Sequence, residues 1–141
     1  MNELIVPILG AGLMMILLVV VVCLLVFTFA FQYSANIVAK KDLTFWMSLA
    51  IVVLGGVAFG GVNLPVSFLM DAVGLPEIAV VIIGFIISFC ATSYVYLLML
   101  NINFWKASLI QIATLIISLF SLVGLIFAFS LYYQFLFGYF I

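Results

Sequence analysis

The chain has 141 residues, of which 71% are hydrophobic and 5% are charged, whereas a soluble domain is about half apolar and about a quarter charged. This composition predicts that lipid, rather than water, surrounds most of the folded chain. The net charge of -1 argues against a nucleic-acid partner, because binding to phosphates requires a basic surface that displaces counterions.

Four apolar runs are each long enough to cross a bilayer, which takes about 20 residues in an α-helix. The runs show none of the alternation of polar and apolar residues that marks barrel strands, so helices are favoured. We therefore predict an all-α membrane protein with a single transmembrane domain over residues 1–141, folded as a four-transmembrane-helix bundle. The expected spans are residues 8–32, 45–63, 76–100 and 104–133, followed by an aromatic C-terminal tail at 134–141.

Polar and proline residues mark the expected ends of these spans. Thr44 and Asn103 are suited to be N-caps of the second and fourth spans, because their side chains can accept a bond from a free backbone N–H. Pro76 suits the first turn of the third span, where a missing N–H costs nothing. Pro65, close behind Asn63, is expected to end the second span.

The three lysines predict the orientation of the chain. Lys40 and Lys41 lie between the first two spans and Lys106 lies at the start of the fourth, near the loop that precedes it, so four crossings place all three on one side. The positive-inside rule makes that side cytoplasmic and puts both termini on the opposite side. Trp46 and Trp105 follow these loops and are expected to anchor the helix ends at the interface.

Two short segments resemble one another. Residues 42–46 (DLTFW) and 101–105 (NINFW) both enter a helix and both end in Phe-Trp. One interpretation is a duplication, with two helical hairpins related by pseudo-two-fold symmetry about an axis along the membrane normal. The alternative is convergence, because a polar cap followed by aromatic residues is common wherever a helix starts at the interface.

Small and polar side chains form stripes on the second, third and fourth spans. Such residues allow helix backbones to approach closely, and their hydroxyl groups can form bonds between helices. The favoured interpretation is therefore helix packing, within the subunit or towards partners, and the alternative is a polar path for a solute or an ion. The candidate residues are Gly56 and Gly60, which form a GxxxG motif, Gly84, Ser88, Thr92, Gln111, Thr114, Ser118 and Ser121.

The sequence offers few groups that could carry chemistry. It contains no His, so bis-His haem ligation and a His-dependent serine hydrolase are not expected. No carboxylate lies in the middle of a span, and Cys23 and Cys90 have no neighbouring base, so neither a proton carrier nor a thiol nucleophile is predicted. We expect a protein that is not an enzyme and that has no catalytic, cofactor-binding or metal-binding residues.

Three functions are compatible with this pattern. The favoured one is a small accessory or scaffold subunit that associates, through its helices, with other integral membrane subunits of a larger complex or with copies of itself. A homo-oligomeric channel or small-solute transporter that uses the polar stripe of the fourth span is an alternative. A lipid-interacting or membrane-shaping protein is another, and membrane lipid is an expected partner in every case.

Overall fold

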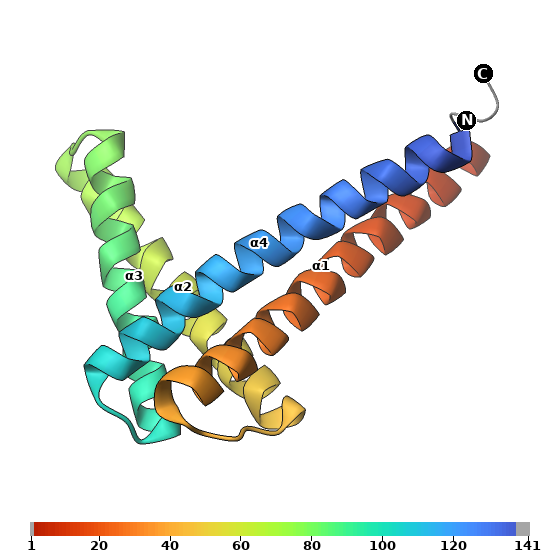
Figure 1. The fold of residues 1–141 in the computed structure, drawn as a ribbon. Helices are drawn as coiled ribbons and strands as arrows, with labels where there is room; N and C mark the ends of the chain where they lie inside the picture. Colours follow the sequence, from red (N-terminus) through yellow and green to blue (C-terminus); the bar gives the residue numbers. More distant parts are fainter. Residues whose placement is uncertain (1, 138–141) are drawn as a thin grey trace.

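The computed structural model describes the backbone of residues 2–137 and the side chains of residues 12–135. This part of the chain folds into four helices (Figure 1): α1 (Asn2–Ala39), α2 (Phe45–Val73), α3 (Glu77–Leu100) and α4 (Phe104–Phe137). Each helix is long and apolar enough to cross a membrane. The predicted all-α fold with four transmembrane helices is confirmed, and the chain fits a multi-pass membrane protein.

The helices are longer than the spans expected from the sequence. The prediction that Pro65 ends the second helix is wrong, because α2 continues through it to Val73. A proline removes the N–H that would bond the carbonyl of residue i−4, here Gly61, and membrane helices tolerate this loss where packing and local adjustments satisfy the freed group. Near this point the Ser67 hydroxyl donates to the Asn63 carbonyl at 2.9 Å. At the other end of the chain, the first part of the aromatic tail belongs to α4, and residues 138–141 lie outside the described residues.

The starts of the helices agree closely with the sequence. The Thr44 hydroxyl accepts a bond from the backbone N–H of Met47 at 3.4 Å, which confirms Thr44 as the N-cap of α2. Asn103 immediately precedes α4, and its carbonyl accepts from the N–H of Ala107 at 3.0 Å. Pro76 occupies the N-cap position of α3 rather than its first turn, one residue earlier than expected.

Three helices end on a residue in the left-handed conformation. Lys40, Gly74 and Asn101 follow α1, α2 and α3 with φ values of 53°, 72° and 49°. A left-handed residue at this position turns the chain back so that the following N–H groups reach carbonyls of the last turn. The first of these turns is also held by Gln32, whose Nε2 donates to the Leu43 carbonyl at 2.6 Å.

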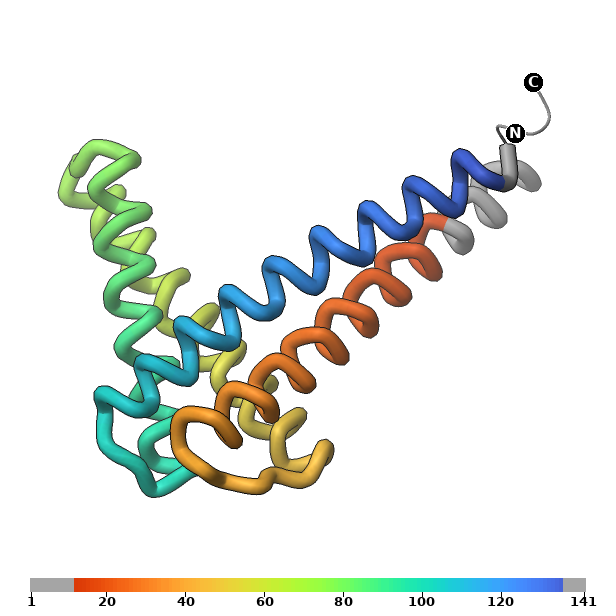
Figure 2. The backbone as a smooth tube through the Cα atoms, viewed as in Figure 1, coloured from red at the N-terminus to blue at the C-terminus, as the bar shows by residue number. Residues whose placement is uncertain are grey.

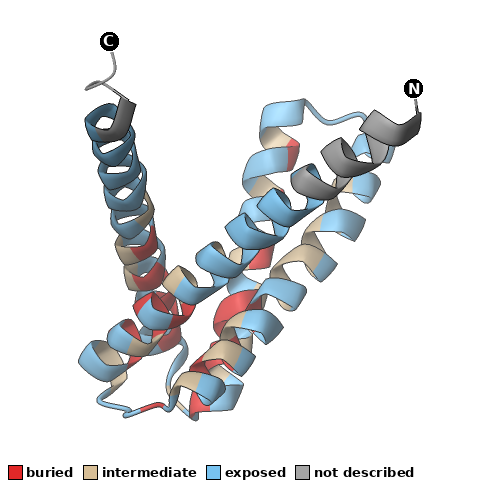
Figure 3. Cartoon of the chain, turned by 90° about the vertical axis from the view of Figure 1, so that its right-hand side faces the viewer, coloured by how far each residue is buried: buried red, intermediate tan, exposed pale blue. Residues whose placement is uncertain are grey.

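The four helices meet at one end and separate towards the other. Residues 40–44 and 101–103, which connect α1 to α2 and α3 to α4, lie together at the closed end (Figure 2). From there α2 and α3 run as a packed antiparallel pair, whereas α1 and α4 overlap in Figure 1 but diverge in Figure 3. The bundle is therefore open, and most of the described surface of α1 and α4 is exposed.

The packing between helices has a symmetric pattern. α2 packs most extensively on α3 and α1 on α4, whereas α1 packs less on α2 and α3 packs less on α4. Exchanging the first two helices with the last two leaves this pattern unchanged. It is compatible with the pseudo-two-fold relation considered from the sequence, and a duplication of the hairpin stays a prediction.

The hydrophobic core lies at the closed end. Its buried residues come from all four helices and from the first connection: Phe31, Ala35, Leu43, Ile51, Tyr96, Leu100, Ala107 and Ile110. The rings of Phe31 and Tyr96 are in contact, with centroids 4.8 Å apart. Because lipid is as apolar as these side chains, van der Waals packing and hydrogen bonds, rather than hydrophobic burial, hold such a core together.

The lengths of the helices explain why they cannot all stand upright in a bilayer. α3 has 24 residues and α1 has 38, so they measure about 36 Å and about 57 Å at about 1.5 Å per residue. The hydrocarbon layer is about 30 Å thick, and a longer helix tilts or projects from it. The divergence of α1 from α2 and α3 agrees with a strong tilt of α1.

Candidate functional site: a groove between the four helices

A groove of about 720 Å³ lies above the core, where the helices begin to separate. All four helices contribute to its walls. Its lining is almost entirely apolar and contains no charged side chain: Val19, Val20, Cys23, Leu24 and Phe27 from α1, Val52, Val53, Gly55, Gly56, Val57 and Phe59 from α2, Phe85, Thr92 and Tyr96 from α3, and Gln111, Thr114 and Leu115 from α4. Its volume is in the range that holds a small molecule.

A buried polar cluster joins α3 to α4 beside this groove. The Ser93 hydroxyl donates to Gln111 Oε1 at 2.6 Å, and the Ser108 hydroxyl donates to Ser93 Oγ at 3.4 Å. All three side chains are buried. Gln111, predicted from the sequence as a packing or path residue, therefore takes part in a bond between helices, and its two partners were not singled out from the sequence.

Two threonines of the groove bond to backbone carbonyls. The Thr114 hydroxyl donates to Ile110 O at 2.7 Å within α4. The Thr92 hydroxyl is shared between Ser88 O of its own helix at 3.0 Å and Gly55 O of α2 at 3.3 Å. Thr92 is thus a contact between α2 and α3, as the packing interpretation expects.

The close approach of α2 to α3 occurs at Gly55. A Cβ atom at this position would lie 2.9 Å from Cε1 of Tyr96 and 3.2 Å from Cγ2 of Thr92. In contrast, no atom lies within 4 Å of a Cβ placed at Gly56 or Gly60, the two residues of the predicted GxxxG motif. Within the subunit, Gly55 rather than Gly56 or Gly60 makes the contact between α2 and α3. Sequence spacing identified the glycine-rich segment but could not identify which of its faces meets α3.

The remaining predicted residues of α3 and α4 are mostly buried. Gly84 contacts α2, because a Cβ there would lie 2.7 Å from Asn63 Oδ1. Ser88 and Ser118 are fully buried, and their hydroxyls have no hydrogen-bond partner among the described residues, as is also true of Ser48. These serines therefore serve as small side chains that permit close packing.

Ser121 lies apart from the other members of its predicted stripe. It is exposed and lines a shallower hollow of about 320 Å³ between α1 and α4, together with Tyr33 and apolar residues. The predicted stripe of α4 is therefore divided among three environments, since Gln111 and Thr114 line the large groove, Ser118 is buried and Ser121 lines the second hollow.

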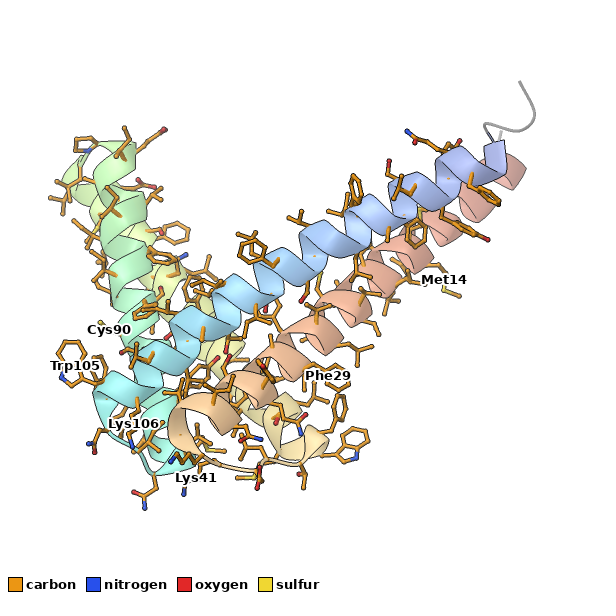
Figure 4. The ribbon with its side chains drawn as sticks, in the orientation of Figure 1. Met14, Phe29, Lys41, Cys90, Trp105 and Lys106 are labelled. Atoms are coloured by element: carbon orange, nitrogen blue, oxygen red, sulfur yellow. The ribbon has the colours of Figure 1, made fainter. Side chains whose placement is uncertain are left out.

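The loop end carries the residues expected at the membrane interface. Lys41 and Lys106 lie at this end of the molecule, and Trp105 projects outward beside them (Figure 4). Trp46 and Trp105 are 75% and 80% exposed, as anchors in the interface would be. The cytoplasmic location of the loop end stays a prediction.

Few side chains in the described part of the chain could bind a metal ion or react to form a covalent bond. No three of its His, Cys, Asp or Glu side chains come together, and Cys23 and Cys90 are free thiols. The candidate site is therefore an apolar groove with a few hydrogen-bonding groups in its wall. Comparison of the chain with family models, with curated proteins and with solved structures finds no match.

Proposed function

We propose that this protein is a small non-catalytic accessory subunit of a larger integral membrane complex, and that it acts by helix–helix association. The observation that carries the proposal is the unused glycine face of α2. Gly56 and Gly60 form a small-xxx-small pair, yet no atom of the described chain lies within 4 Å of a Cβ at either position. Such pairs are a common surface for close contact between membrane helices.

The polar residues support this proposal over a channel. Thr92 and Gln111 bond to neighbouring helices, and Thr114 bonds within its own helix. Ser88 and Ser118 are buried where helices pack. A conducting path needs polar groups that remain available to a solute along a continuous route, whereas most of these groups are already used for packing.

The experiment is purification in mild detergent followed by native mass spectrometry. We expect the wild-type chain to be recovered with another polypeptide or with further copies of itself. Gly56→Leu and Gly60→Leu should release that partner, because a large side chain prevents close approach of a second backbone. Gly124→Leu is the matched control, since Gly124 lies on α4 and also has no atom within 4 Å of a Cβ.

Two results would contradict the proposal. One is recovery of the wild-type chain only as a monomer from the mildest detergents. The other is an association that survives both Gly56→Leu and Gly60→Leu while the variants remain folded by circular dichroism. In the second case the association would use another face of the molecule.

A further inference from the structure

Two polar side chains at the base of the groove have hydrogen-bonding capacity that the described chain does not use. Gln111 and Tyr96 are each 6% exposed, and both line the groove. The amide oxygen of Gln111 accepts from Ser93, but its Nε2 bonds to no described residue. The Tyr96 hydroxyl contacts Gly55 sterically and likewise has no hydrogen-bond partner among the described residues.

The hydroxyl groups of the neighbouring threonines, in contrast, have hydrogen-bond partners within the chain. Thr92 and Thr114 line the same groove, but both donate to backbone carbonyls of the helices. The buried hydroxyls without a partner in the described chain belong to Ser48, Ser88 and Ser118, whereas Gln111 Nε2 and the Tyr96 hydroxyl retain accessible surface. In hydrocarbon no water is available to serve as their partner. The groove therefore presents an amide N–H and a phenolic O–H that are available to an acceptor from outside the chain.

We propose that the groove binds a neutral lipophilic molecule dissolved in the membrane, with a carbonyl oxygen bound by Gln111 Nε2 and the Tyr96 hydroxyl. The apolar body of this molecule lies against α1 and α2, on side chains such as Val20, Phe27 and Val57. The proposal rests on donors of α3 and α4, and it shares with the glycine face only Gly56, which also lines the groove.

The absence of charge along the groove selects this class of ligand. None of the lining residues is charged, so an ionised head group would lose its hydration there without gaining a counterion. Gln111 lies seven residues after the start of α4 at Phe104, which is about 10 Å along the helix. Phospholipid head groups stay at the interface, whereas a neutral carbonyl compound can enter to this depth.

The test is photo-crosslinking of the full chain in nanodiscs with two matched probes. The first probe is a long-chain alkyl ketone with a diazirine near the end of its tail, and the second is the same alkane without the carbonyl. We expect the ketone to label the groove residues of α1 and α2 saturably, and to be displaced by unlabelled ketone. The alkane should label lipid-facing residues without saturation.

Variants identify the two donors. Gln111→Leu and Tyr96→Phe each remove one donor, and each should weaken ketone labelling about threefold to tenfold, as expected for the loss of one hydrogen bond. Tyr94→Phe is the matched control, because Tyr94 lies on the same helix but is 57% exposed and does not line the groove. Tyr96→Phe keeps the ring packing, so it remains informative if Gln111→Leu disturbs the fold.

Three results would overturn the proposal. Equal labelling by the two probes would show that the carbonyl is not recognised. Labelling that does not change in Tyr96→Phe and Gln111→Leu would show that these donors are not the site. Saturable displacement of the ketone by diacyl phospholipid, or by a transmembrane helix cross-linked in the groove, would identify a different occupant.

Discussion

Replacement of Gly55 by alanine is the sharpest test of the packing between α2 and α3. The added methyl group would lie 2.9 Å from Cε1 of Tyr96 and 3.2 Å from Cγ2 of Thr92. The Tyr96 ring cannot move away easily, because it is buried and packs on Phe31 at a centroid distance of 4.8 Å. The helices must therefore separate, or the core must rearrange.

The expected change in the free energy of unfolding follows from two opposing contributions. Inserting a methyl group into a packed core costs about 1–3 kcal/mol, whereas replacing glycine by alanine inside a helix favours the folded state by about 1 kcal/mol. Gly56→Ala gains only the stabilisation from the alanine, since nothing lies within 4 Å of its Cβ. The free energy of unfolding of Gly55→Ala should therefore fall below that of Gly56→Ala by about 1–3 kcal/mol.

The assay is reversible unfolding in mixed micelles of mild detergent and dodecyl sulfate, followed by circular dichroism. A double variant, Gly55→Ala with Thr92→Ser, should recover part of the loss, because serine lacks the Cγ2 atom but keeps the hydroxyl that donates to Gly55 O. Equal stability of Gly55→Ala and Gly56→Ala would refute the close approach of α2 and α3 at Gly55.

Three further predictions concern polar groups and orientation. A double-mutant cycle of Ser93→Ala and Gln111→Leu should give a coupling energy of about 0.6 kcal/mol in the same unfolding assay, as for other membrane hydrogen bonds, and zero coupling would refute the bond. Ser118→Ala should leave stability unchanged or raise it by about 1 kcal/mol, because it removes a buried hydroxyl without a partner in the described chain; a loss would mean that the hydroxyl is bonded. Lys41→Cys, with both native cysteines replaced by alanine, should react with an impermeant maleimide only from the cytoplasmic side, and reaction from the other side would reverse the assigned orientation.

Much of the secondary structure is determined locally, and the sequence alone predicted it. A helix end in a membrane depends on a cap residue and on the run of apolar residues beside it, so Thr44 and Asn103 placed the starts of α2 and α4 correctly. The same local reasoning was wrong at Pro65. An internal proline removes one backbone hydrogen bond, a loss that membrane helices tolerate, and α2 continues through Pro65 to Val73.

The candidate site could be predicted only in part. Gln111, Thr92 and Thr114 were recognised because polar residues in an apolar run are conspicuous, and all three line the groove. Tyr96 and Gly55 were not among the candidate residues identified from the sequence. Their roles arise from contact between α2 and α3, which no spacing along one helix reveals.

Local sequence is enough to predict four apolar helices, the starts of three of them, and the positions of their polar residues. These properties depend on neighbours within one or two turns. Packing between the helices, in contrast, leaves the bundle open, brings Gly55 rather than Gly56 against α3, and places Gln111 and Tyr96 in the lining of one groove. In lipid the outer faces of such a helix are as apolar as its packing face, so the hydrophobic pattern does not identify the packing face. Small differences in shape and hydrogen bonding select that face instead.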